Sequence, residues 1–265
     1  MDIPVKRWYE GIKVRRSRRN YNSKIIPADL LDELKSFVRR ANKRFNDARI
    51  VVINQNPDEV FKGAIGSYGK IKGAQAYAAF VGDMTSKNVQ ENLGYLGEAF
   101  ILEATSFGLS TCWVGGFFRP EIVKEHITDL SPAEKVIAVT PIGYSDENFS
   151  IREKLMFGSK PFHKRKDINE LCIGSRQEEL DPRIITALEA ARLAPSAVNR
   201  QPWRFTVEGK SIKISVDSDK DSFHLSKRLD CGIAMLHLEV GALYQGLSGS
   251  WEYLETPDVA SFTVK

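Results

Sequence analysis

The sequence predicts an α+β protein in which one unit of helices and strands is used twice. Apolar residues at helical spacing alternate along the chain with short apolar runs that are typical of buried strands. The same order of elements restarts after a polar stretch at 145–161. A length of 265 residues is also enough for about two domains or one large one.

The first half, 1–150, is expected to contain three strands, two main helices and a short amphipathic segment. A glycine after the second helix is a common helix stop. The expected elements are helix Leu30–Ala41, strands Ile50–Ile53 and Ala74–Val81, helix Val89–Gly108, the segment Pro120–Thr128 and strand Lys135–Pro141.

A linker with a basic end is expected at 151–170, and a second, degenerate repeat at 171–265. Small residues on one face of its last helix predict a close-packing face. The expected elements are helix Ile184–Leu193, paired strands Trp203–Val207 and Ser211–Val216, and helix Asp230–Leu247. The alternative is that two helices of similar composition occur by chance.

Composition excludes several classes of protein. Hydrophobic residues make up 42% and charged residues 27% of the chain, as in ordinary globular proteins. No run approaches the roughly 18 apolar residues of a membrane span, and the N-terminal stretch has no apolar signal-peptide region. A net charge of +4 is too small to indicate nucleic-acid binding by itself. We therefore expect a cytoplasmic protein with neither a membrane nor a nucleic acid as partner.

The cysteines and histidines indicate neither disulfides nor a metal. Cys112, Cys172 and Cys231 are odd in number and far apart, which favours free thiols. No histidine has cysteine or carboxylate neighbours at the spacing of metal ligands, so no metal site is expected.

Basic residues gather in two short clusters, at 15–19 and 163–166. Such clusters can be a solvated face, a localisation signal or a nucleic-acid patch. Ser17 lies between the arginines of the first cluster, and a hydroxyl among guanidinium groups suits the charge-assisted hydrogen bonds of a phosphate.

Several motifs together resemble the nitroreductase family, whose members bind FMN. The run from Arg15 to Tyr21 resembles the opening motif of that family, and Ala194–Trp203 is similar to its Pro-Ser-Asn-Gln-Pro-Trp motif. Gly108–Phe117 is similar to a third motif, and Pro161–Lys166 to the basic C-terminal end. The resemblance implies a nitroreductase-like fold of two fused repeats, each with a mainly antiparallel sheet flanked by helices, arranged as a pseudo-dimer.

One departure from the family pattern is informative. Family members carry the arginine motif and the Pro-Ser motif in the same half of a short chain that works as a homodimer. Here the first lies at 15–19 and the second at 194–203. A fused, divergent pair would need only one complete site. The resemblance therefore implies a subfamily with an internal duplication, and a monomer with one FMN per chain.

The resemblance also implies a role for each motif. The two basic clusters would hold the FMN phosphate from two sides, the Pro-Ser loop would follow the ring edge and ribityl chain, and the third motif would pass under the ring. Two residues near 67–70 are weaker candidates for the pyrimidine edge. The implied cofactor-binding residues are Arg15, Arg16, Ser17, Arg19, Ser67, Lys70, Trp113, Val114, Gly115, Gly116, His163, Lys164, Arg165, Pro195, Ser196, Ala197 and Asn199.

The implied activity is hydride transfer from NAD(P)H through flavin N5 to a planar, electron-poor small molecule such as a nitroaromatic or a quinone. FMN carries this chemistry, so no catalytic side chain is named. One alternative is a non-catalytic FMN-binding or sensing protein whose access is blocked by Phe117, Phe118 or Trp251. Another is a basic nucleic-acid-binding module built on 15–19.

Overall fold

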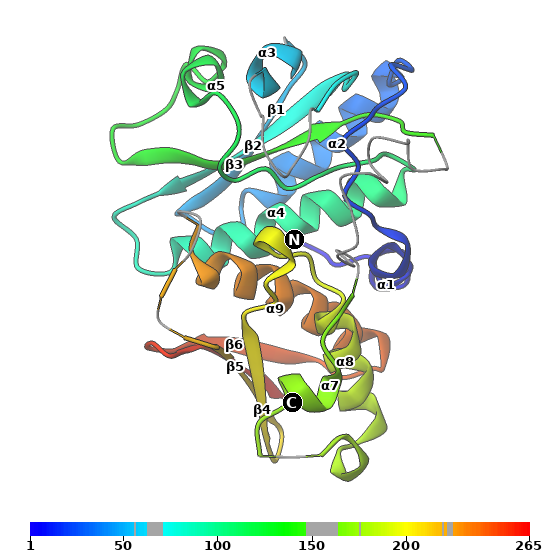
Figure 1. Cartoon of the computed structure of the whole chain (residues 1–265), viewed down its shortest axis with the longest axis vertical. Helices are drawn as coiled ribbons and strands as arrows, with labels where there is room; N and C mark the ends of the chain where they lie inside the picture. Colours follow the sequence, from blue (N-terminus) through cyan, green and yellow to red (C-terminus); the bar gives the residue numbers. More distant parts are fainter. Residues whose placement is uncertain (56, 63–70, 147–163, 175, 219, 222–224) are drawn as a thin grey trace. The chain divides into compact units, whose positions relative to one another are not determined.

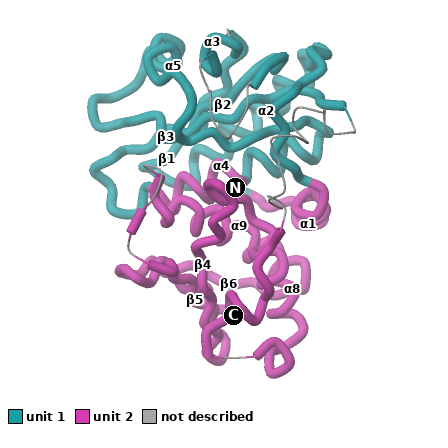
Figure 2. The backbone as a smooth tube through the Cα atoms, viewed as in Figure 1, with its two compact units in different colours: residues 1, 15–89, 99–162 teal, residues 2–14, 90–98, 163–265 magenta. Residues whose placement is uncertain are grey.

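The computed structural model (Figure 1) describes residues 1–55, 57–62, 71–146, 164–174, 176–218, 220–221 and 225–265. The chain forms two compact units, which we call the first and the second unit (Figure 2). The first unit comprises residues 1, 15–89 and 99–162, and the second comprises residues 2–14, 90–98 and 163–265. Helices and antiparallel sheets occur in both, which confirms the α+β class.

The first unit is built on a three-stranded antiparallel sheet in the order β1-β2-β3. Its elements are α2 (Ala28–Ala41), β1 (Ala48–Ile53), α3 (Pro57–Phe61), β2 (Ala76–Asp83), the C-terminal part of α4 (Val89–Ser106), α5 (Pro120–His126) and β3 (Glu134–Ile142).

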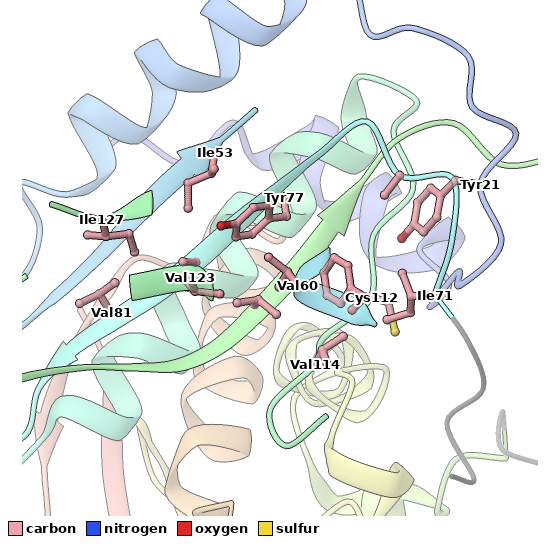
Figure 3. Packing of buried hydrophobic residues seen from close by; sticks show 14 residues of the cluster. Tyr21, Ile53, Val60, Ile71, Tyr77, Val81, Cys112, Val114, Val123 and Ile127 are labelled. Carbon is pink, nitrogen blue, oxygen red and sulfur yellow. The ribbon is translucent and has the colours of Figure 1, made fainter. Parts of the chain in front are cut away.

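The central strand β2 is buried along nearly its whole length because both of its faces are covered. Tyr77 and Val81 point into one apolar cluster with Val123 of α5 (Figure 3). Phe80 alternates to the opposite face, where its ring centroid lies 6.4 Å from that of Phe100 on α4. Coverage of both faces explains why this strand reads as an uninterrupted apolar run in the sequence.

The second unit has a four-stranded antiparallel sheet in the order β4-β5-β7-β6. A tight turn with Gly209 at φ +57° joins its first two strands. The elements are α1 (Val5–Val14), the N-terminal part of α4, α7 (Ile168–Leu171), α8 (Pro182–Arg192), β4 (Trp203–Glu208), β5 (Ser211–Val216), α9 (Lys227–Tyr244), β6 (Gly249–Tyr253) and β7 (Asp258–Val264), with 3-10 turns at Gln177–Glu179 and Ala197–Asn199.

Helices α4 and α9 have the same length and end in the same way. Each has 18 residues and is followed by a glycine with φ +74°, at Gly108 and Gly246. The N–H of the residue after each glycine donates back into the helix. Leu109 donates to the Ala104 carbonyl at 3.0 Å, and Leu247 donates to the Ala242 carbonyl at 2.9 Å. A left-handed glycine with this backbone hydrogen bond is a common helix end, so the glycine stop predicted for α4 is confirmed.

Along the chain the first unit has β1, α3, β2, α4, α5 and β3, and the second has β4, β5, α9, β6 and β7, so a long helix follows the second strand in both. Strands β4-β5-β7 of the second sheet are ordered like β1-β2-β3 of the first, and β6 is added at one edge of the second sheet. The two sheets thus share the order of three strands, and the use of one unit twice stays a prediction.

Helix α1, strands β6 and β7, the short helices α3 and α7 and the two 3-10 turns were not predicted. Helix α1 buries Trp8 and Ile12, which have the i, i+4 spacing of a helix face within a charge-rich stretch. Strands β6 and β7 follow the last predicted helix. Within the part of the chain that the structure describes, no helix is both long and apolar enough to cross a membrane.

Candidate functional site

The basic run at 15–19 follows α1 and becomes extended in the first unit. Ser17 and Thr111 form a parallel bridge, and the Arg18 N–H donates to the Thr111 carbonyl at 2.9 Å. The Lys72 N–H donates to the Arg19 carbonyl at 3.2 Å. The backbone of the run is therefore held by two other segments of the same unit.

The side chains of this run differ in exposure. Arg15 and Arg18 are buried, Ser17 and Arg19 are half-buried, and Arg16 is exposed and donates to the Arg15 carbonyl at 2.8 Å. Sequence reasoning did not select Arg18. A buried guanidinium requires polar surroundings, because transfer of an unsatisfied charge out of water is costly. The run therefore combines exposed and buried cationic groups around one hydroxyl.

The third motif lies along β3. Val114 exchanges two backbone hydrogen bonds of 2.9 Å with that strand, and its side chain joins the apolar cluster (Figure 3). Trp113 is half-buried, with its ring centroid 4.5 Å from that of Phe80. Gly115 is half-buried and Gly116 is exposed. The motif thus leaves the sheet and reaches the surface of the first unit within a few residues.

The first unit brings the basic run and the third motif together through the bridge between Ser17 and Thr111. The predicted site residues Ser67, Lys70 and His163 lie outside the described residues. No group of three His, Cys, Asp or Glu side chains that could hold a metal occurs among the residues that are described.

The Pro-Ser loop lies in the second unit, between α8 and β4, and has a strained backbone. Val198, Asn199 and Gln201 have φ values of 47°, 58° and 49°. This left-handed region is uncommon for residues other than glycine, and a β-branched residue there is an outlier. Such conformations cost on the order of 1–3 kcal/mol each, persist only where the surroundings fix them, and concentrate at ligand sites.

Hydrogen bonds from the basic segment 164–166 fix this loop. Arg165 Nη1 donates to Asn199 Oδ1 at 2.5 Å, and Asn199 Nδ2 donates to the Lys164 carbonyl at 3.0 Å. Gln201 Oε1 accepts the Lys166 N–H at 2.8 Å. The second unit therefore brings together two segments that the sequence separately suggests as cofactor-binding.

Inside the loop, Ser196 Oγ accepts the Gln201 N–H at 2.9 Å. Pro195 is buried, whereas Ser196 and Ala197 are half-buried. The hydroxyl of Ser196 thus has a structural role in closing the loop.

Asp230, in the first turn of α9, also contacts the loop and was missed by sequence reasoning. Its Oδ1 accepts the Ala197 N–H at 3.1 Å, and its Oδ2 accepts from Arg200 Nε at 2.6 Å. Burial raises the pKa of Asp230 to about 6, against the lowering effect of Arg200. Acidic residues are common in first turns of helices, so no sequence signal relates this aspartate to the loop.

The sequence model of a protein family described as "Putative TM nitroreductase" matches residues 7–242. The chain belongs to this nitroreductase family. The resemblance drawn from the motifs is thereby confirmed. Among curated proteins this chain has no match.

A solved structure from Thermotoga maritima MSB8, described as a "putative nitroreductase", is 22% identical in sequence. The alignment covers 97% of this chain and 93% of the chain from Thermotoga maritima, with a TM-score of 0.66. The fold is therefore shared over nearly the whole length of both chains.

Two shorter nitroreductases align with part of the chain. A nitroreductase with bound FMN from Bacteroides fragilis NCTC 9343 is 20% identical and covers 57% of this chain and 92% of its own, with a TM-score of 0.42. A nitroreductase family protein from Clostridium difficile 630 is 20% identical. Its alignment covers 68% of this chain and 100% of that protein, with a TM-score of 0.47.

Proposed function

We propose that this chain is an FMN-dependent oxidoreductase that holds one FMN and transfers a hydride from NAD(P)H to a planar, electron-poor acceptor such as a nitroaromatic or a quinone. The observation that carries the proposal is the grouping of the motifs. In the first unit the basic run lies against the third motif, and in the second the segment 164–166 is bonded to the Pro-Ser loop. Membership of a nitroreductase family supports the same assignment.

The donor set of the basic run suits a phosphate dianion. Arg15, Arg16 and Arg19 carry guanidinium groups, whose planar donors match phosphate oxygens, and Ser17 adds a hydroxyl. Backbone hydrogen bonds hold the run at Thr111 and Lys72, so the backbone that carries these donors is in place before a ligand arrives. We assign the phosphate of FMN to this run, with Lys164 and its neighbours as further cationic contacts.

The third motif suits the face of a flat ring. Trp113 is held against Phe80, and Val114 is anchored to β3. Gly115 and Gly116 have no Cβ, so their backbone N–H groups can approach a ring closely. When bound, FMN supplies the redox chemistry itself, and the side chains need only bind and orient it.

The Pro-Ser loop suits the polar edge of the ring and the ribityl chain. Both polar atoms of the Asn199 side-chain amide are held, because Oδ1 accepts from Arg165 and Nδ2 donates to the Lys164 carbonyl. Fixing a polar group in this way lowers the entropy lost when a ligand binds. We therefore assign Pro195, Ser196, Ala197 and Asn199 to flavin binding.

The visible spectrum of the purified protein tests this function, with flavin quantified per chain before anaerobic addition of NADPH or NADH. We expect close to one FMN per chain and bleaching of its absorbance by a nicotinamide. FMN that neither nicotinamide bleaches would instead indicate a non-catalytic flavin-binding protein. A chain with no affinity for added FMN would contradict the cofactor assignment.

A further inference from the structure

Asp230 is a buried carboxylate whose two oxygens both bind the Pro-Ser loop. Its side chain is 3% exposed and that of Arg200 is 11% exposed. One oxygen accepts the Ala197 N–H and the other accepts from Arg200, so the two contacts lie on either side of Val198 and Asn199. Arg200 is anchored a second time, because its Nη2 donates to the Leu225 carbonyl at 3.1 Å.

The loop requires such anchoring because its conformation is intrinsically unfavourable. Val198 and Asn199 are both left-handed, and without restraint an L-residue prefers other regions of φ and ψ. The segment 164–166 bonds to the Asn199 and Gln201 side chains and to the Gln201 carbonyl, whereas Asp230 bonds to the backbone N–H at Ala197, on the other side of the left-handed residues 198 and 199. Asp230 is thus the side chain of α9 that ties the loop backbone to the helix.

We infer that Asp230 is a positioning residue that fixes the left-handed backbone of the Pro-Ser loop in the conformation that binds flavin. The flavin part of this inference rests on the proposed function. The conformational part does not, because it follows from the contacts of Asp230 alone.

Ionisation of Asp230 should therefore control the loop. Burial raises the pKa of this carboxyl to about 6, and of the charged groups around it, Arg200 lowers that pKa while Asp221 raises it. Cys231 neighbours it on α9, and Glu91 of α4 is ion-paired with Arg228 of α9. Above about pH 6 the carboxylate accepts both hydrogen bonds, and below that pH the protonated group loses its charge-assisted bond to Arg200.

The test compares the full-length wild-type chain with Asp230→Asn and with Glu189→Gln as a matched control. The first change sets an amide N–H donor or an uncharged oxygen against the Arg200 donor. The control removes another guanidinium–carboxylate pair of the second unit at the same 2.6 Å distance, Arg192–Glu189. Amide hydrogen exchange of the peptide spanning 196–201 is measured at about pH 5 and about pH 7.5 and corrected for the intrinsic rate, beside FMN affinity at the higher pH.

In the wild type and in Glu189→Gln, we expect the loop to be better protected at the higher pH. In Asp230→Asn, we expect weak protection at both pH values and FMN affinity lower by about tenfold, as for loss of a hydrogen bond to a charged group. Equal protection and equal FMN affinity in all three chains would overturn the inference and leave the flavin function intact. A wild type that binds no FMN, but whose loop still depends on Asp230, would support the positioning role and remove the proposed function. If Asp230→Asn does not fold, protection of the wild-type loop that is independent of pH overturns the inference.

Discussion

Guanidinium groups determine what the basic run can bind. Replacement of Arg15 and Arg19 together by alanine should weaken FMN binding by about 100-fold or more, because a hydrogen bond between charged groups contributes roughly 1.5–3 kcal/mol. The backbone bonds of the run to Thr111 and Lys72 remain, so the far-ultraviolet circular dichroism should not change. Fluorescence titration of FMN measures the affinity.

The matched control for this double variant is Arg39→Ala with Arg40→Ala. Both residues are exposed on α2 of the first unit, and their removal changes the net charge by the same amount. FMN affinity close to that of the wild type is expected for the control. Equal weakening in both double variants would show that only general electrostatic attraction is lost, which would exclude a specific phosphate contact at the run.

At the scale of elements, two glycines allow α4 and α9 to cross closely. A Cβ built on Gly232 would lie 2.2 Å from the Glu91 carbonyl oxygen, and one on Gly94 would lie 2.1 Å from the Leu229 carbonyl oxygen. Gly232 of α9 thus packs on the backbone of α4 at Glu91, three residues before Gly94. In the same way, Gly94 packs on the backbone of α9 at Leu229, three residues before Gly232. Gly232→Ala should lower the free energy of unfolding by about 3 kcal/mol, since overpacking outweighs the better helix propensity of alanine.

Denaturant unfolding followed by circular dichroism measures this effect. Ala234→Gly, the reverse exchange at another buried position of α9, should cost about 2 kcal/mol, because it loses a buried methyl group as well as helix propensity. Because Gly94 and Gly232 lie at one crossing, the double alanine variant should lose less than the sum of the single losses. A Gly232→Ala chain as stable as the wild type would show that the helices can separate without cost.

At the scale of the whole molecule, the repeated order of elements predicts a chain that acts as its own partner. Three strands of the second sheet, β4-β5-β7, are ordered like β1-β2-β3 of the first, and α4 and α9 match in length and in their glycine ends. We therefore expect a monomer with one FMN per chain, and light scattering coupled to size exclusion should give the mass of one chain. A stable dimer carrying two FMN per chain would contradict the internal pseudo-dimer.

Local sequence patterns were sufficient to predict most elements. Apolar spacing located α2, α4, α8 and α9, and apolar runs located the strands of the first sheet. Helix α1 was missed because its two large buried side chains, Trp8 and Ile12, lie within a charge-rich stretch. Strands β6 and β7 were missed because a short strand is stabilised by its neighbours as much as by its own residues.

By itself, the sequence determined the family, the order of most elements and the segments that carry the motifs, because these depend on residue types at short, fixed spacing. Only the tertiary structure decided that Arg165 bonds to Asn199, that Val198 is left-handed, and that Asp230 holds Ala197. These features join segments about 30 residues or more apart, or force a backbone against its own preference. Neither is encoded by local pattern, because the energy that maintains them comes from contacts that exist only once the second unit has folded.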